Sequence, residues 1–258
     1  MNRTGLFIAL SLAFVIAVIF GIYPELDLKL AALFYDPHTH SFPLSGDRLA
    51  SLARNGAMVI SWGLALPAIG ALIVKLVRPD RPLLMSGRAV MFLLLTLMLS
   101  AGVLTNFTFK TFWDRPRPVS VTQFGGALPF VAWWDPRGRC SHNCSFFSGE
   151  GATAFWTFAP AALAPPAWRP LAYTGAFVFG LTTSVLRMAF GGHFFTDVAT
   201  AGLASFVVIW LAFGYIYRWQ RTRLSDSAID AALTRFAWPG YRFRQRLFGR
   251  ETGPAPSA

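Results

Sequence analysis

The chain has 258 residues, of which 54% are hydrophobic and only 14% are charged. Soluble domains carry about 25% charged residues, so this composition, with a mean hydropathy of +0.47, excludes an ordinary soluble domain and predicts an integral membrane protein. The formal net charge is +11, and in a membrane protein its placement along the chain says more than its size.

Six uncharged stretches follow one another along the chain, each roughly 17–21 residues long, which is the length a helix needs to cross a bilayer core of about 30 Å. They cover residues 4–23, 55–74, 89–109, 151–168, 170–186 and 198–217. The predicted fold class is therefore all-α, a bundle of six transmembrane helices. The first stretch follows Arg3 as a signal peptide would, but residues 20–24 lack a small-x-small cleavage pattern, which favours a retained anchor.

Positive residues cluster at alternate ends of these stretches, and lysine and arginine prefer cytoplasmic loops. The clusters are Arg3, then Lys75, Arg78, Arg81 and Arg88, then Arg169, and finally Arg218, Arg221 and Arg223. We therefore predict a multi-pass protein of the inner (plasma) membrane with both termini in the cytoplasm. Segments 24–54, 110–147 and 187–197 are then on the periplasmic or outer face.

The first outer segment, residues 24–54, is polar and is predicted to hold a short surface helix. It contains His38 and His40, which suit either a metal site or a solvated pair of loop residues. Of the two interpretations the solvated pair is favoured.

The second outer segment, residues 110–147, is rich in positive residues. Lys110 and Arg117 are candidates for binding a phosphoryl group, because a guanidinium group can hold two phosphate oxygens at once. Arg115, Arg137 and Arg139 suit either a multiply anionic headgroup or ordinary loop charges.

The same segment holds the two cysteines of the chain, Cys140 and Cys144. On an outer face a local disulfide between them is permitted. A metal site is the weaker alternative, because His142 is the one further ligand nearby.

Two later groups of residues add to the candidate site. Ser148 stands where a helix N-cap belongs, and Gly149 lets backbone amides approach an anion closely. Arg187 is a third cation, while His193 and Asp197 form an i, i+4 pair on one helix face. In such a pair the carboxylate can orient the ring as a nucleophile. The predicted topology places all these residues on the outer face.

These residues resemble the three motifs of the type-2 phosphatidic-acid phosphatase superfamily, which read Lys-x₆-Arg-Pro, Pro-Ser-Gly-His and Ser-Arg-x₅-His-x₃-Asp. The similarity extends over roughly residues 50–217, and six membrane helices is what membrane members of that family have. The first motif is complete as Lys110-x₆-Arg117-Pro118, and the third lacks only its serine, which is Leu186 here.

The resemblance implies a role for each motif residue and implies no metal or other cofactor. Lys110, Arg117 and Arg187 would bind the phosphate, Ser148 and Gly149 would hydrogen-bond to it, His193 would become the phosphohistidine, and Asp197 would orient it.

The second motif departs from the family pattern at two positions, with Phe147 in place of Pro and Glu150 in place of His. In the family that histidine protonates the leaving group, whereas a free glutamate has a pKa of about 4.3, which neighbouring cations lower further. Three interpretations stay open: burial keeps Glu150 protonated, His142 supplies the acid, or the leaving group is itself acidic and needs none. A carboxylate could also serve as general base for the hydrolytic water.

We therefore expect a membrane lipid phosphatase that hydrolyses a phosphate monoester or pyrophosphate through a phosphohistidine. By the resemblance the candidate substrates are phosphatidic acid, phosphatidylglycerol phosphate, undecaprenyl pyrophosphate and the phosphates of lipid A, and Glu150 with the cysteine-containing loop favours lipid A. The alternatives are a lipid phosphotransferase with the same intermediate and a catalytically silent protein that binds lipid phosphate.

Three parts of the chain are expected: a first helix with its outer loop (1–54), a phosphatase core (55–217) and a basic cytoplasmic tail (218–258). The tail is interpreted as an interfacial helix on anionic lipid rather than a nucleic-acid-binding segment, so no nucleic acid partner is expected. Residues 251–258 are expected to be disordered. The arginines that suggest lipid contact are Arg235, Arg242, Arg244, Arg246 and Arg250.

Overall fold

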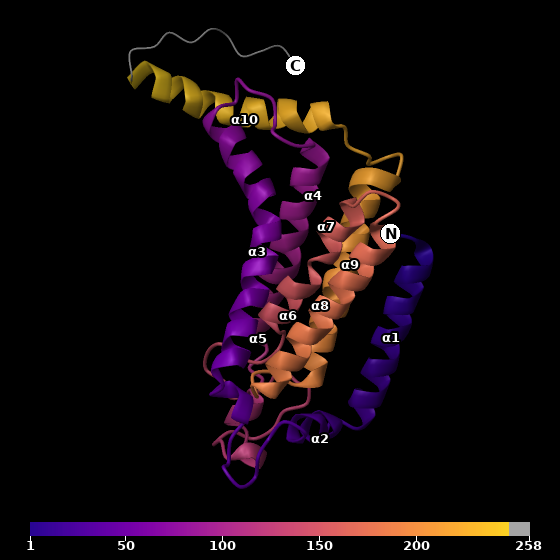
Figure 1. Cartoon of the computed structure of the whole chain (residues 1–258), viewed down its shortest axis with the longest axis vertical. Helices are drawn as coiled ribbons and strands as arrows, with labels where there is room; N and C mark the ends of the chain where they lie inside the picture. The colour runs from indigo at the N-terminus through magenta and orange to yellow at the C-terminus, as the bar shows by residue number, and fades with distance from the viewer. Residues whose placement is uncertain (248–258) are drawn as a thin grey trace. The chain divides into compact units, whose positions relative to one another are not determined.

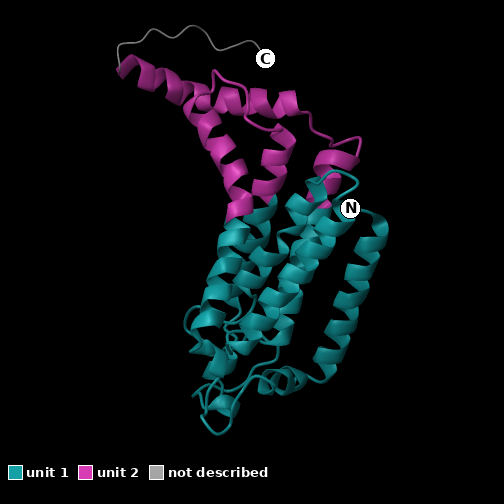
Figure 2. Cartoon of the chain, viewed as in Figure 1, with its two compact units in different colours: residues 1–62, 96–210 teal, residues 63–95, 211–258 magenta. Residues whose placement is uncertain are grey.

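The computed structural model describes residues 1–247 and shows helices joined by loops, with no strand among these residues (Figure 1). The all-α prediction is therefore confirmed. The chain divides into two compact units (Figure 2): unit 1 holds residues 1–62 and 96–210, and unit 2 holds residues 63–95 and the chain from residue 211 on.

Four helices are long and apolar enough to cross a membrane, and they match the first, second, third and sixth predicted stretches. In chain order they are α1 (Arg3–Ile22), α3 (Arg48–Val77), α4 (Gly87–Leu97) continued by the π-helical η2 (Met98–Phe109) and α5 (Lys110–Phe112), and α9 (Phe195–Phe213) continued by η5 (Gly214–Arg218).

The other two predicted stretches are not confirmed as membrane spans. The fourth is broken into α6 (Gly149–Phe155) and α7 (Phe158–Leu163), which are only seven and six residues long. The fifth forms α8 (Arg169–Ala189), whose 21 residues are long enough to cross a bilayer. However, Arg187 and the polar run Thr182–Ser184 make it less apolar than the four candidate spans.

The broken fourth stretch is an interior element of unit 1. The ring of Phe155 fills the space left by two glycines of neighbouring helices: a Cβ atom on Gly180 or Gly202 would lie 2.4 or 2.7 Å from it. Trp156 is fully buried, and its indole Nε1 donates to the hydroxyl of Thr96 at 3.0 Å. The glycines of α8 and α9 thus permit close contact with this stretch.

The outer segments are held by aromatic packing, because they contain little regular structure. The first holds α2 (Leu26–Ala32), as predicted, and the short turn η1 (Pro43–Ser45). The second begins with α5 and continues with the short turns η3 (Pro118–Ser120) and η4 (Thr122–Phe124). One cluster joins both segments to the start of α9; its buried members are Ala31, Phe42, Val121, Phe124 and Phe194. This packing fixes the loops that surround the site.

Unit 2 contains α10 (Asp226–Leu247), which occupies part of the predicted tail. Asp226 lies 3.1 Å from Nη2 of Arg88, and Asp230 lies 3.0 Å from the buried Nζ of Lys75. These ion pairs hold α10 within the unit. Its contact with a lipid surface stays a prediction, and Arg250 with the predicted disordered residues 251–258 lies outside the described residues.

Candidate active site

The three groups of motif residues meet in unit 1. The carboxylate of Glu150, from the second motif, lies 3.5 Å from Nε of Arg187 in the third. A Cβ atom on Gly149 would lie 3.4 Å from Nζ of Lys110 in the first. Segments that are far apart in sequence therefore converge on one site, while the side of the membrane that it faces stays a prediction.

The ring of His193 is buried and held in one orientation. Its Nδ1 lies 2.7 Å from the carbonyl oxygen of Ser145, so Nδ1 carries the proton and donates it to that oxygen. The lone pair of Nε2 is then available for attack on phosphorus. Burial, outweighing the nearby Asp197 carboxylate, lowers the pKa of His193 to about 4, so the ring is neutral at neutral pH.

Asp197 acts on the ring less directly than the sequence suggested. Its Oδ2 is 3.8 Å from Nδ1 of His193, beyond hydrogen-bond distance, and the direct partner of the ring is the Ser145 carbonyl. The same Oδ2 accepts from the hydroxyl of Ser145 at 2.5 Å and from the amide of Phe194 at 2.8 Å. The carboxylate thus positions Ser145, and Ser145 positions the ring.

Arg115 is a structural cation rather than a substrate ligand or an ordinary loop charge. Its side chain is fully buried between two carboxylates, with Nη1 2.5 Å from Asp197 and Nη2 2.7 Å from Asp27. Thr196 completes the group, because its hydroxyl donates to Asp27 at 2.6 Å and its amide donates to the same carboxylate at 3.0 Å. A buried charge needs such pairing to persist.

The three cations of the motifs differ in their surroundings. Arg117 donates from Nε and Nη2 to the carbonyl and side-chain oxygens of Asn143, at 2.8 and 2.7 Å. Arg187 is nearly buried, and its Nε has no hydrogen bond within the described part of the chain. A Cβ atom on Gly192 would come within 2.5 Å of Nη2 of Arg187, so the guanidinium group packs closely against this glycine. The partner of Arg187 at the site is the carboxylate of Glu150, 3.5 Å from its Nε.

Ser148 is the N-cap of α6, as predicted. It is fully buried and its hydroxyl accepts from the amide of Gly151 at 3.1 Å. Gly149 follows it at the first helical position, with Nζ of Lys110 above it. The cap therefore places the first amides of α6 beside a cation of the first motif.

Glu150 is held by arginines from two other helices. Arg54 of α3 donates from Nε at 2.9 and 3.0 Å and from Nη2 at 2.5 Å, while Arg187 lies on its other side. Burial alone would raise the pKa of Glu150, but the Arg54 hydrogen bonds and the charges of Arg187 and Arg54 outweigh it and lower the pKa. This geometry argues against the interpretation in which Glu150 stays protonated.

The loop that contains His142 contacts the site through the next residue, Asn143. Cys140 and Cys144 are joined by a disulfide. His142 is exposed, and its Nδ1 lies 2.9 Å from the hydroxyl of Ser141. The following residue, Asn143, makes the contacts with Arg117. The role of His142 as an acid stays a prediction.

Four residues that build the site were not identified from the sequence as contributors: Asp27, Arg54, Asn143 and Ser145. None belongs to a motif, and two lie more than 80 residues from their partners. Asp27 and Arg54 are polar residues in a segment expected to be solvated. Their one sequence signal is an ionisable side chain beside a predicted membrane span.

Comparison with protein families places the motif residues inside a known domain. A family model described as the PAP2 superfamily matches residues 89–221. No solved structure matches the chain.

Curated relatives carry one shared name. The chain is 31% identical over 223 residues to the "Lipid A 4'-phosphatase" of Francisella tularensis subsp. novicida, a match that covers 84% of this chain and 98% of the relative. It is 37% identical over 113 residues to the protein of the same name from Rhizobium leguminosarum, covering 44% of this chain and 48% of the relative. A third, from Rhizobium etli, is 38% identical over 112 residues, covering 43% and 44%.

Proposed function

Because the chain belongs to the PAP2 superfamily, we propose that it is a lipid A phosphatase that removes the 4'-phosphate by way of a phosphohistidine at His193. The family and the likeness to these relatives make the chain a membrane hydrolase of lipid phosphate monoesters. The particular phosphate and the covalent intermediate are the proposal. The observation that carries it is the buried ring of His193, held through Nδ1 by the Ser145 carbonyl at a site with three cations.

In the first step, the lone pair of His193 Nε2 forms a bond to phosphorus while the bond from phosphorus to the lipid oxygen breaks. Lys110, Arg117 and Arg187 neutralise the charge on the phosphoryl oxygens. The positive charge that develops on the ring is balanced by the Ser145 carbonyl and the Asp197 carboxylate. The leaving oxygen takes a proton from solvent, because ionised Glu150 has none to give.

In the second step, water attacks phosphorus and the nitrogen–phosphorus bond breaks, which returns the electron pair to Nε2. An ionised carboxylate suits this step, because it can accept a proton from the attacking water. Glu150 lies beside Arg187 and is held in place by Arg54, so it is positioned for this role. We therefore assign Glu150 as general base and not as general acid.

The same proposal includes the orientation expected from the positive residues. Both termini are in the cytoplasm, and the site opens to the periplasmic or outer face.

Phosphate release by the purified protein in detergent tests the proposed function. Lipid A that carries phosphates at positions 1 and 4' should lose the 4'-phosphate faster than phosphatidic acid, phosphatidylglycerol phosphate or undecaprenyl pyrophosphate lose theirs, as free phosphate and product mass would show. Loss of only the 1-phosphate, or preference for another lipid, would contradict the proposed substrate. A phosphorylated acceptor lipid in place of free phosphate would indicate a phosphotransferase.

Replacing Glu150 by glutamine should slow the second step and leave the first intact. The amide of glutamine cannot accept a proton from water, so we expect turnover to fall by roughly 10²-fold or more, with phosphoenzyme accumulating. Quenching the reaction with radioactive substrate and counting the label that stays on the protein measures this directly.

The matched control for that variant is Glu25→Gln, because Glu25 is exposed at the start of the first outer segment. Its turnover should equal that of the natural protein. Unchanged turnover in Glu150→Gln would remove both a base and an acid role for this residue. Slower turnover without accumulated label would move its role to the first step.

A further inference from the structure

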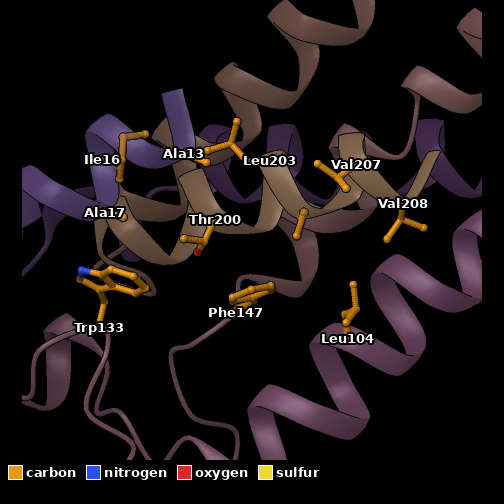
Figure 3. A pocket seen from close by; sticks show the side chains of 11 residues that line it. Ala13, Ile16, Ala17, Leu104, Trp133, Phe147, Thr200, Leu203, Val207 and Val208 are labelled. Carbon is orange, nitrogen blue, oxygen red and sulfur yellow. The ribbon is translucent and has the colours of Figure 1, made fainter. Parts of the chain in front are cut away.

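An apolar cavity lies beside the candidate site within unit 1 (Figure 3). Its volume is about 410 Å³, and its walls come from α1, η2, α9 and the loop before α6. Ala13 and Ala17 of α1 face Leu203 and Thr200 of α9 across it in the close view. Thr200 carries the one hydroxyl group among the lining residues, so the cavity suits an apolar ligand.

The cavity is continuous with residues that build the site. Phe147 lines it and directly precedes the N-cap Ser148. The ring of Phe147 stacks on Phe109 with centroids 4.1 Å apart, and Phe109 directly precedes Lys110. Thr200 follows Asp197 by three residues, less than one helical turn. Phe147 and its stacking partner Phe109 therefore connect the cavity to the candidate phosphate-binding residues that follow them in the chain.

Three residues of α1 line the cavity, and two of them, Ala13 and Ala17, have small side chains; the third is Ile16. Ala13 and Ala17 are four residues apart and so lie on one face of α1. The neighbouring positions that point elsewhere carry larger residues, such as Phe14 and Val15, which are 70% and 48% exposed. If α1 contacted lipid on all sides, its side chains would not be expected to differ in size between the face that lines the cavity and the exposed face.

We propose that the cavity binds an acyl chain of the substrate lipid while its phosphate lies at His193. This inference rests on the proposed function, because it needs a lipid whose phosphate is held at this site. The volume of the cavity falls within the range of ligand pockets, about 300–1,000 Å³. A chain tethered to a bound headgroup has a high local concentration at an adjacent cavity, which favours it over free lipid.

Filling the cavity tests this assignment. In Ala17→Trp we expect KM for acylated lipid A to rise by roughly tenfold, which corresponds to the lost burial of about two methylene groups. Phosphate release from the same disaccharide bisphosphate without its acyl chains should be unchanged, which also shows that the variant folds. Val15→Trp, on an exposed position of the same helix, is the matched control and should alter neither rate.

The outcomes separate the two proposals. If the natural protein releases phosphate from neither substrate, the proposed function fails. If it is active and Ala17→Trp leaves KM for acylated lipid A unchanged, or lowers both rates equally, the acyl-chain assignment is overturned.

A photo-crosslinking residue gives a second measurement that does not depend on turnover. Placed at position 17, it should label lipid A, and excess unlabelled lipid A but not phosphatidylethanolamine should compete. The same residue at position 15 should show no such selectivity. Equal competition by phosphatidylethanolamine at position 17 would mean that bulk membrane lipid fills the cavity and would overturn the proposal.

Discussion

Replacement of His193 by asparagine is expected to lower phosphate release from lipid substrates by roughly 10⁴-fold or more, the size of loss seen when a nucleophile is removed. Asparagine preserves a polar side chain of similar size but has no ring nitrogen to attack phosphorus. The variant should also take up no label from radioactive substrate, because no phosphohistidine can form. Steady-state turnover and acid-sensitive labelling are the two measurements.

The matched control is His38→Asn, because His38 lies in the exposed part of the first outer segment. Its turnover should be that of the natural protein. Residual turnover within about tenfold of the natural rate in His193→Asn would place the nucleophile elsewhere, and the covalent mechanism would fail.

The titration of His193 adds an observation that does not depend on turnover. With ¹⁵N-labelled histidine, the signal missing from His193→Asn should titrate near pH 4, because burial disfavours the charged ring. Its pKa is lowered below the ordinary value of about 6.5, so the neutral, nucleophilic form persists down to about pH 4 and is lost below it. Titration at the ordinary histidine value would contradict the buried geometry.

Replacement of Arg115 by methionine is expected to lower the free energy of unfolding by about 3–5 kcal/mol, the cost of removing one partner from a buried ion pair. Asp27 and Asp197 are both fully buried and would lose the cation between them. Turnover should fall as well, because Asp197 holds Ser145 and thereby the ring of His193. Thermal or denaturant unfolding in detergent gives the stability, and phosphate release gives the activity.

Arg137→Met is the matched control for Arg115→Met, because it removes an exposed arginine instead of a buried one. Arg137 pairs with Asp135 but is 82% exposed, so its loss should leave the free energy of unfolding nearly unchanged. Adding Asp27→Asn to Arg115→Met should restore part of the lost stability, because one of the unpaired carboxylates becomes neutral. Equal effects of Arg115→Met and Arg137→Met would mean that the buried network does not stabilise the fold.

Hydropathy alone predicted some of the candidate membrane spans but not all of the helices. Four of the six predicted stretches are helices long and apolar enough to cross a membrane. The stretch at 151–168 was wrong as a single helix, because an uncharged run is apolar whether it faces lipid or the interior of a unit. The alanines of α6 and α7 are buried, and both of these short helices contact α8. Length and composition cannot separate these two environments.

The motif residues were predictable because their spacing is local. The i, i+4 relation of His193 and Asp197, the N-cap at Ser148 and the cation at Arg187 can each be read from a few consecutive residues. The sequence also suggested that these segments meet, and the structure brings them together. The direct partner of the ring was missed, because a backbone carbonyl such as that of Ser145 has no signature in the sequence.

By itself, then, the sequence determined a helical membrane protein, its family motifs and a set of candidate phosphate-binding residues. Only the tertiary structure decided what holds them: Arg115 between Asp27 and Asp197, and Arg54 beside Glu150. These pairs join residues 82 to 96 positions apart. The energy of an ion pair depends on distance and burial, and the sequence states neither. The contacts of Glu150 with Arg54 and Arg187 lower the pKa of its carboxyl group, and the sequence does not show these contacts.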